Sequence, residues 1–125
     1  MDATAKVRFI MSSNTQELTF TQHTDKRGKP FFVPDALPEL TPDQAMRTVV
    51  LPIHLDWSTP GKVRPMSDER HRREVYRIVL QEGGPEDIKQ YVDGRLLVEL
   101  WSDIYLPVMI HEAWQPLIDQ IIAKT

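Results

Sequence analysis

Two pairs of neighbouring side chains in this sequence carry the donor atoms of a metal site. His54 and Asp56 flank Leu55 in a segment expected to be extended, and His111 and Glu112 are adjacent in an expected helix. Two imidazoles and two carboxylates would suit Zn²⁺ or another divalent ion. Adjacent helical residues point about 100° apart, however, so the second pair chelates one ion poorly. We therefore expect no metal and no other cofactor, and keep a metal-dependent enzyme as an alternative.

Motifs for nucleophilic catalysis and phosphate binding are absent from the sequence. No Gly-x-Ser-x-Gly elbow or Ser-x-x-Lys pair occurs, and the glycines form no phosphate-binding loop. The chain has no cysteine, which excludes disulfides, thiolate nucleophiles and zinc–cysteine sites. Asp56, beside Trp57, is the carboxylate to test for a raised pKa, and a turn residue is its ordinary interpretation. We assign no catalytic residue and expect no enzyme.

Three expected helices between residues 68 and 105 have the size of a helix-turn-helix unit. The first of them carries four arginines that could meet DNA phosphates, namely Arg70, Arg72, Arg73 and Arg77. The expected recognition helix carries Glu99 and Asp103 instead, whose negative charge repels the phosphate backbone. The net charge of -3 does not recruit DNA either. A small DNA-binding regulator or antitoxin-like protein is therefore the alternative function.

Large apolar side chains in proline-rich and turn segments form the candidate partner surface. Phe31, Phe32, Trp57 and Met66 lie where a small core does not reach every side chain. Exposed aromatic residues are typical of protein interfaces, although burial in the core is the ordinary alternative for each of them. We predict a non-catalytic interaction module, a regulator, inhibitor or accessory subunit, that binds another protein. A second copy is the other expected partner, because the N-terminal hairpin has a free edge.

Length and composition indicate one small soluble domain over residues 1–125. The 125 residues are 41% hydrophobic and 26% charged, as expected for a single core. No apolar run is long enough to cross a bilayer, and the start has no signal-peptide pattern. We therefore expect a cytoplasmic protein with no membrane partner. Charge is uneven: residues 62–77 hold six basic and three acidic side chains, residues 78–119 two basic and eight acidic.

The N-terminal third is expected to form strands. Apolar and other residues alternate over 6–11 and again over 18–20, on either side of a polar break, which indicates an antiparallel hairpin. Phe31-Phe32-Val33 is either a third strand or an apolar anchor packed on the core. Thr41-Pro42-Asp43-Gln44 has the capping-box pattern with proline at the first helical position. It predicts a helix from Pro42 to about Val50.

The second half is expected to be helical, after a short extended run at 53–57 and a seam near 60–65. Ser67 is the expected N-cap of a helix that Gly83-Gly84 ends, and Pro85 opens the next one. Two further helices are expected, one from Arg95 to about Tyr105 and one after Pro107, with Trp101 and Trp114 in the core. The predicted fold class is α+β: an N-terminal antiparallel hairpin or small three-stranded sheet followed by a cluster of three to four short helices.

Overall fold

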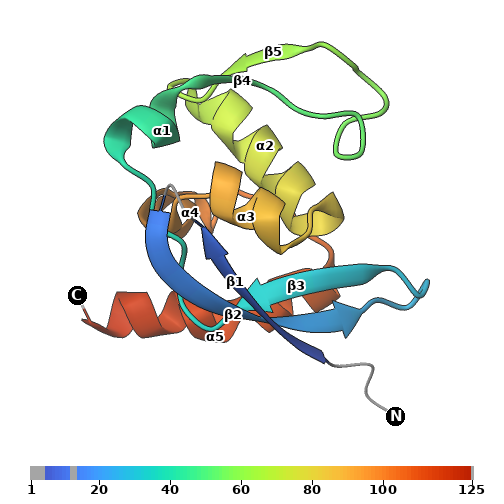
Figure 1. Ribbon diagram of the computed structural model, residues 1–125, viewed down its shortest axis with the longest axis vertical. Helices are drawn as coiled ribbons and strands as arrows, with labels where there is room; N and C mark the ends of the chain where they lie inside the picture. The colour runs from blue at the N-terminus through green and yellow to red at the C-terminus, as the bar shows by residue number, and fades with distance from the viewer. Residues whose placement is uncertain (1–4, 12–13, 125) are drawn as a thin grey trace.

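The computed structural model describes the backbone of residues 5–11 and 14–124. Within these residues the fold is α+β, with one three-stranded and one two-stranded antiparallel sheet and five helices (Figure 1). This confirms the predicted fold class. The elements follow in the order β1 (Ala5–Met11), β2 (Asn14–Thr24), β3 (Pro30–Pro34), α1 (Pro42–Met46), β4 (Thr48–Val50), β5 (Val63–Pro65), α2 (Glu69–Glu82), α3 (Pro85–Tyr91), α4 (Gly94–Leu100) and α5 (Val108–Lys124).

The three-stranded sheet has the order β1-β2-β3, and its β1–β2 pair is the hairpin that the alternation of residue types predicts. Leu18 and Phe20 on β2 are 1% and 0% exposed, and β3 adds Phe31 at 2%. The turn between β2 and β3 is closed by the Asp25 carboxylate, which accepts the backbone N–H groups of Arg27 and Lys29 at 2.9 and 2.8 Å. The predicted hairpin and third strand are therefore both present, and one face of the sheet enters the core.

Helix α1 begins as predicted but ends earlier. The Thr41 hydroxyl accepts the Gln44 backbone N–H at 3.2 Å, and the Gln44 side chain accepts the Thr41 N–H at 3.2 Å. The expected end at Val50 is wrong, since the helix stops at Met46 and Thr48–Val50 forms β4. Three consecutive β-branched residues favour a strand, and β5 supplies the antiparallel partner that the local sequence does not reveal.

The segment 53–57, predicted to be extended, forms a turn. The backbone N–H groups of Leu55 and Asp56 both donate to the Pro52 carbonyl, at 2.9 and 3.1 Å. No neighbouring strand pairs with this segment among the residues that the structure describes. Its backbone therefore satisfies its hydrogen bonds locally, and the loop between β4 and β5 folds back on itself.

Helices α2, α3 and α4 follow one another with short connections, as predicted, with two corrections. The N-cap of α2 is Asp68 rather than Ser67, because the Asp68 carboxylate accepts the Arg70 backbone N–H at 2.9 Å. Helix α4 ends at Leu100 rather than near residue 105. The chain then forms a turn, in which the Asp103 N–H donates to the Leu100 carbonyl at 2.8 Å.

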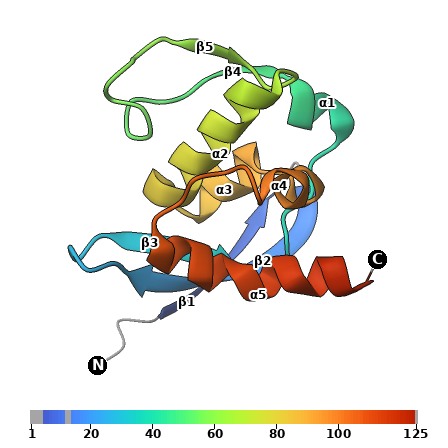
Figure 2. The same ribbon diagram turned by 180° about the vertical axis from the view of Figure 1, so that it is seen from behind.

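The core combines residues from both sides of segment 60–65, and the seam expected there remains a prediction. Trp101 and Trp114, predicted to be core, are 7% and 0% exposed. Helix α2 contacts β3, β5 and α3, and α5 crosses the three-stranded sheet on the side seen in Figure 2. In both views β4 and β5 lie at the opposite end of the molecule from α5. None of the described helices combines the length and the apolar character needed to cross a membrane.

Candidate functional site

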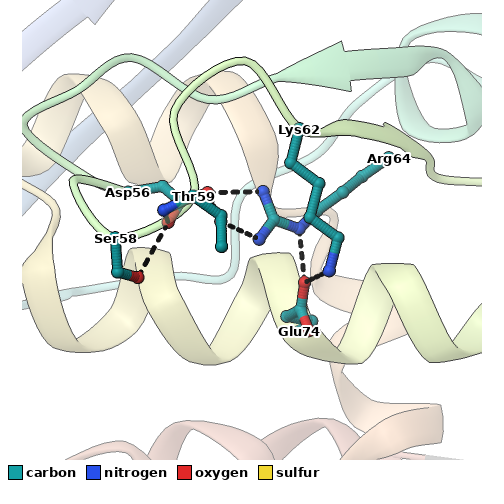
Figure 3. Close-up of polar contacts among 6 residues, drawn as sticks. All are labelled: Asp56, Ser58, Thr59, Lys62, Arg64 and Glu74. Carbon is teal, nitrogen blue, oxygen red and sulfur yellow. Dashed lines mark hydrogen bonds and ion pairs between the residues drawn. The ribbon is translucent and has the colours of Figure 1, made fainter.

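A buried ion-pair network fastens the β4–β5 loop to α2 (Figure 3). Arg64 on β5 is 3% exposed, and its Nη1 donates to Asp56 Oδ2 at 2.8 Å. Its Nε donates to the Glu74 carboxylate on α2, and its Nη2 donates to Thr59 Oγ1 at 3.3 Å. Burial acts to lower the pKa of Arg64, but the hydrogen bonds to both carboxylates raise it overall. The guanidinium therefore stays charged and joins three segments.

The carboxylate of Asp56 is engaged by its own loop as well. It accepts the Thr59 hydroxyl at 2.6 Å, the Thr59 backbone N–H at 3.2 Å and the Ser58 hydroxyl at 3.5 Å. Hydrogen bonds from Thr59 and then from Arg64 lower the pKa of Asp56 to about 2, although burial opposes them. The raised pKa considered from the sequence is therefore wrong, because these donors stabilise the charged form. At neutral pH Asp56 is an ionised structural anchor and carries no proton to donate.

This lowered pKa predicts a specific acid dependence of stability. The pKa of Asp56 is about 2 in the folded chain against an ordinary value of 3.8, so the stability that its ionised form contributes is complete above about pH 4. That contribution is lost as the pH falls through the range from about 4 to about 2. Between these values the melting temperature of the wild type should fall more steeply than that of Asp56→Asn, with Asp103→Asn as the exposed control. Parallel profiles for wild type and Asp56→Asn would contradict the assignment.

A hollow of about 280 Å³ lies beside the network, between the loop and the C-terminal half of α2. Trp57, which immediately follows the buried Asp56, is among its lining residues and is 75% exposed. Arg77 and Gln81 on α2 line it from the other side. The ion pair between Asp56 and Arg64 thus holds the loop backbone in place, while the indole of Trp57 remains accessible.

A second hollow of about 390 Å³ adjoins the first. It lies between the β2–β3 turn at 25–29 and the start of α5 at 107–110. Gln81 and Glu82 on the last turn of α2 line both hollows. In Figures 1 and 2 the β2–β3 turn, the β4–β5 loop and the C-terminal end of α2 lie on the same side of the molecule. We call the two hollows together the α2 groove.

The four residues predicted to bind a partner occupy different environments. Phe31 and Met66 are each 2% exposed and belong to the core, and the Phe31 ring stacks on His23 with 5.1 Å between ring centroids. Phe32 is half-buried against the core, while Trp57 is 75% exposed. The structure therefore does not bring the four together into one surface. Within the folded chain, Phe31 and Met66 offer little area to a partner because their side chains are enclosed.

The four arginines of α2 also differ in their environments. Arg70 is exposed and pairs with Asp68 at 3.3 Å. Arg72 is held internally, with its Nη1 donating to the Met66 carbonyl at 2.8 Å. Arg73 and Arg77 are half-buried, and neither has an ion pair or side-chain hydrogen bond to any other described residue. One of the four, Arg72, therefore stabilises the fold rather than presenting a free charge.

The histidines considered for a metal site have other neighbours. His54 Nε2 lies 3.1 Å from both carboxylate oxygens of Asp87 on α3, and the His111 ring stacks on Trp101 with 4.7 Å between centroids. Asp56 is bound to Arg64. Across the part of the chain that the structure describes, no three histidine or carboxylate side chains are grouped as metal ligands. The two pairs of donors seen in the sequence do not converge.

Several residues of the site escape sequence reasoning. Arg64 and Glu74 carry no local signal, because their partnership joins a strand to a helix. Three apolar residues on β4, β5 and the loop between them are exposed, although their apolar character alone would place them in the core. They are Val50, Ile53 and Val63, which are 50%, 69% and 58% exposed. Comparisons with protein-family models, curated proteins and solved structures give no match. The function is therefore inferred from the residues and geometry of the chain itself.

Proposed function

We propose that this chain is a non-catalytic cytoplasmic module that binds another protein, or a second copy of itself, through the surface around Trp57. The observation that supports this most directly is a 75% exposed tryptophan on a loop anchored by a buried ion pair. Tryptophan is among the residues that contribute most to protein interfaces. A loop already held in place also loses less conformational entropy on binding than a mobile one. A regulator, inhibitor or accessory subunit acts in this way.

Further apolar side chains are exposed on β4, on β5 and in the turn that follows β4. Val50 and Val63 are direct cross-strand partners and are 50% and 58% exposed, and Ile53 in the following turn is 69% exposed. Grouped apolar residues at a surface are typical of an interaction site.

The carboxylate of Asp56, next to Trp57, is ionised and hydrogen-bonded to Thr59 and Arg64. It is therefore better suited to holding the loop than to acid–base chemistry.

The alternative, a DNA-binding regulator or antitoxin-like protein, has one supporting observation. Arg70, Arg73 and Arg77 are spaced three and four residues apart on α2, so they lie along one face of that helix. Against it, the exposed side chains of the following helices include Glu86 and Glu99, whose charge opposes contact with phosphate.

Affinity capture with matched variants tests the proposal. Tagged wild type, Trp57→Ser and Tyr105→Ser are compared in native lysate, with and without nuclease, by quantitative mass spectrometry. Tyr105 is the control because it is 82% exposed and lines neither hollow. We expect one set of proteins that wild type and Tyr105→Ser retain and Trp57→Ser loses, regardless of nuclease.

The other outcomes are equally informative. The same proteins on all three baits would overturn the assignment of the Trp57 surface, and capture that collapses with nuclease would favour the DNA-binding alternative. Sedimentation velocity of the purified chain identifies a second copy as the partner if the mass is concentration-dependent and Trp57→Ser abolishes that dependence.

A further inference from the structure

We infer that the partner presents an acidic peptide segment with apolar side chains, and that this segment lies along the α2 groove. The inference rests on the proposed function and names the chemistry of the partner. Three features of the groove support it: the carboxylates are neutralised, two cations are not, and exposed apolar side chains lie in both hollows.

The carboxylates that line the groove are all paired with cations of the same chain. Asp56 and Glu74 both bind Arg64, and Glu74 also accepts Lys62 Nζ at 3.2 Å. Glu82 pairs with Lys29 across the junction of the two hollows. In the β2–β3 turn, the Asp25 carboxylate accepts two backbone N–H groups and lies 3.5 Å from Arg27. No lining carboxylate is left to attract a cationic ligand.

Two cations of the groove are not neutralised in this way. Arg77 in the first hollow and Lys26 in the second have no ion pair or hydrogen bond within the described part of the chain. Counted together, six basic and four acidic side chains line the two hollows. The groove is thus locally positive on a chain whose net charge is -3. Electrostatic complementarity therefore favours an anionic segment in the groove.

Exposed apolar side chains lie in both hollows. Trp57 in the first is 75% exposed, while Val108 and Met109 in the second are 70% and 36% exposed. A ligand that follows the groove past Arg77 can therefore bury apolar side chains near both ends. Aliphatic or aromatic residues interspersed with Asp or Glu satisfy both requirements.

A peptide fits this groove better than a nucleic acid does. Bases stack on aromatic rings such as Trp57, but the side chains of Val108 and Met109 offer no hydrogen-bond donors to phosphates or bases. A nucleic acid carries a negative charge at every nucleotide, whereas the six basic and four acidic side chains that line the groove leave a net charge of only +2. Strong phosphate binding needs a series of free cations, whereas the groove has two, Arg77 and Lys26, that lack a partner among the described residues.

Selection from a displayed library of random linear peptides on the full-length chain tests this inference. We expect the enriched peptides to be rich in Asp and Glu and to contain aromatic or aliphatic residues. Their dissociation constants, measured by fluorescence anisotropy, should rise by about tenfold or more in Arg77→Glu and in Val108→Ser. Arg77→Gln should have a smaller effect than Arg77→Glu. Binding should also weaken as the salt concentration increases.

The control is Arg95→Glu, the same charge change at an exposed position of α4 outside the groove. It should leave the dissociation constant within about twofold of the wild-type value, since a distant exposed charge is screened. Melting curves of every variant verify that folding is intact.

Failure of the inference is distinguishable from failure of the proposed function. Enriched peptides without acidic residues, or binding that Arg77→Glu leaves unchanged, would overturn the acidic-peptide inference. If the same peptides still lost affinity in Trp57→Ser, the proposed function would stand. A library that yields no peptide dependent on Arg77 also overturns the inference. A single-stranded oligonucleotide that binds tightly, and that loses affinity in Arg77→Glu, would also overturn the inference. That result would show that the groove binds nucleic acid.

Discussion

Replacement of Arg64 by methionine is expected to lower the free energy of unfolding by about 3–5 kcal/mol. The guanidinium is 3% exposed, donates to Asp56 at 2.8 Å and also binds Glu74. Methionine retains much of the apolar stem but leaves both carboxylates without their shared cation. The loss of stability comes mainly from the negative charge of the buried Asp56, which is left without a cation. Urea denaturation followed by far-UV circular dichroism measures it.

Two further variants separate this effect from simple loss of a positive charge. Arg95→Met removes an exposed arginine of α4 and should change the free energy of unfolding by less than about 0.5 kcal/mol. Adding Asp56→Asn to Arg64→Met removes the Asp56 charge that is left without a cation, and should recover part of the loss. Equal effects of Arg64→Met and Arg95→Met would show that the network does not stabilise the fold. Arg64→Met should also weaken binding that depends on Trp57, because the loop loses its anchor.

Features set by neighbouring residues were predictable from the sequence. The alternation in β1 and β2 and the capping box of α1 each depend on side chains a few residues apart. The same holds for the helix starts at Pro42 and Pro85. These local signals are sufficient for the α+β class and for the approximate position of most elements.

Features set by distant pairing were not predictable. Thr48–Val50 follows a clear helix start, yet it is a strand because β5, thirteen residues or more along the chain, pairs with it. The β4–β5 loop owes its shape to Arg64, which reaches Asp56 eight residues away and Glu74 ten residues away. No periodicity in the sequence marks either pairing.

The α2 groove shows the same limit for the candidate site. Its walls come from the β2–β3 turn, the β4–β5 loop and the start of α5, which are far apart in the sequence. Each wall, taken separately, is an ordinary charged turn or helix end. Its binding chemistry arises only when the fold brings Arg77 and Trp57 into one hollow, so the sequence alone indicated Trp57 but not its surroundings.

Phe31→Ser and Trp57→Ser are expected to have opposite consequences, although both replace an aromatic residue near a turn or proline. Phe31 is 2% exposed on β3, and Phe31→Ser removes its ring from the core and places a hydroxyl there. We expect a loss of about 3–5 kcal/mol in the free energy of unfolding. Trp57→Ser should change it by less than about 0.5 kcal/mol, because its ring is 75% exposed.

Thermal melts and partner binding, measured on the same two variants, distinguish a core residue from an interface residue. Phe31→Ser should lower the melting temperature markedly, and any loss of binding should follow from loss of folded protein. Trp57→Ser should melt like the wild type and still lose its partner. A wild-type melt for Phe31→Ser would mean that its ring is accessible and belongs to a contact surface after all. The strand alternation argues otherwise, since β3 turns Phe31 and Val33 inward and leaves Phe32 half-buried on the other face.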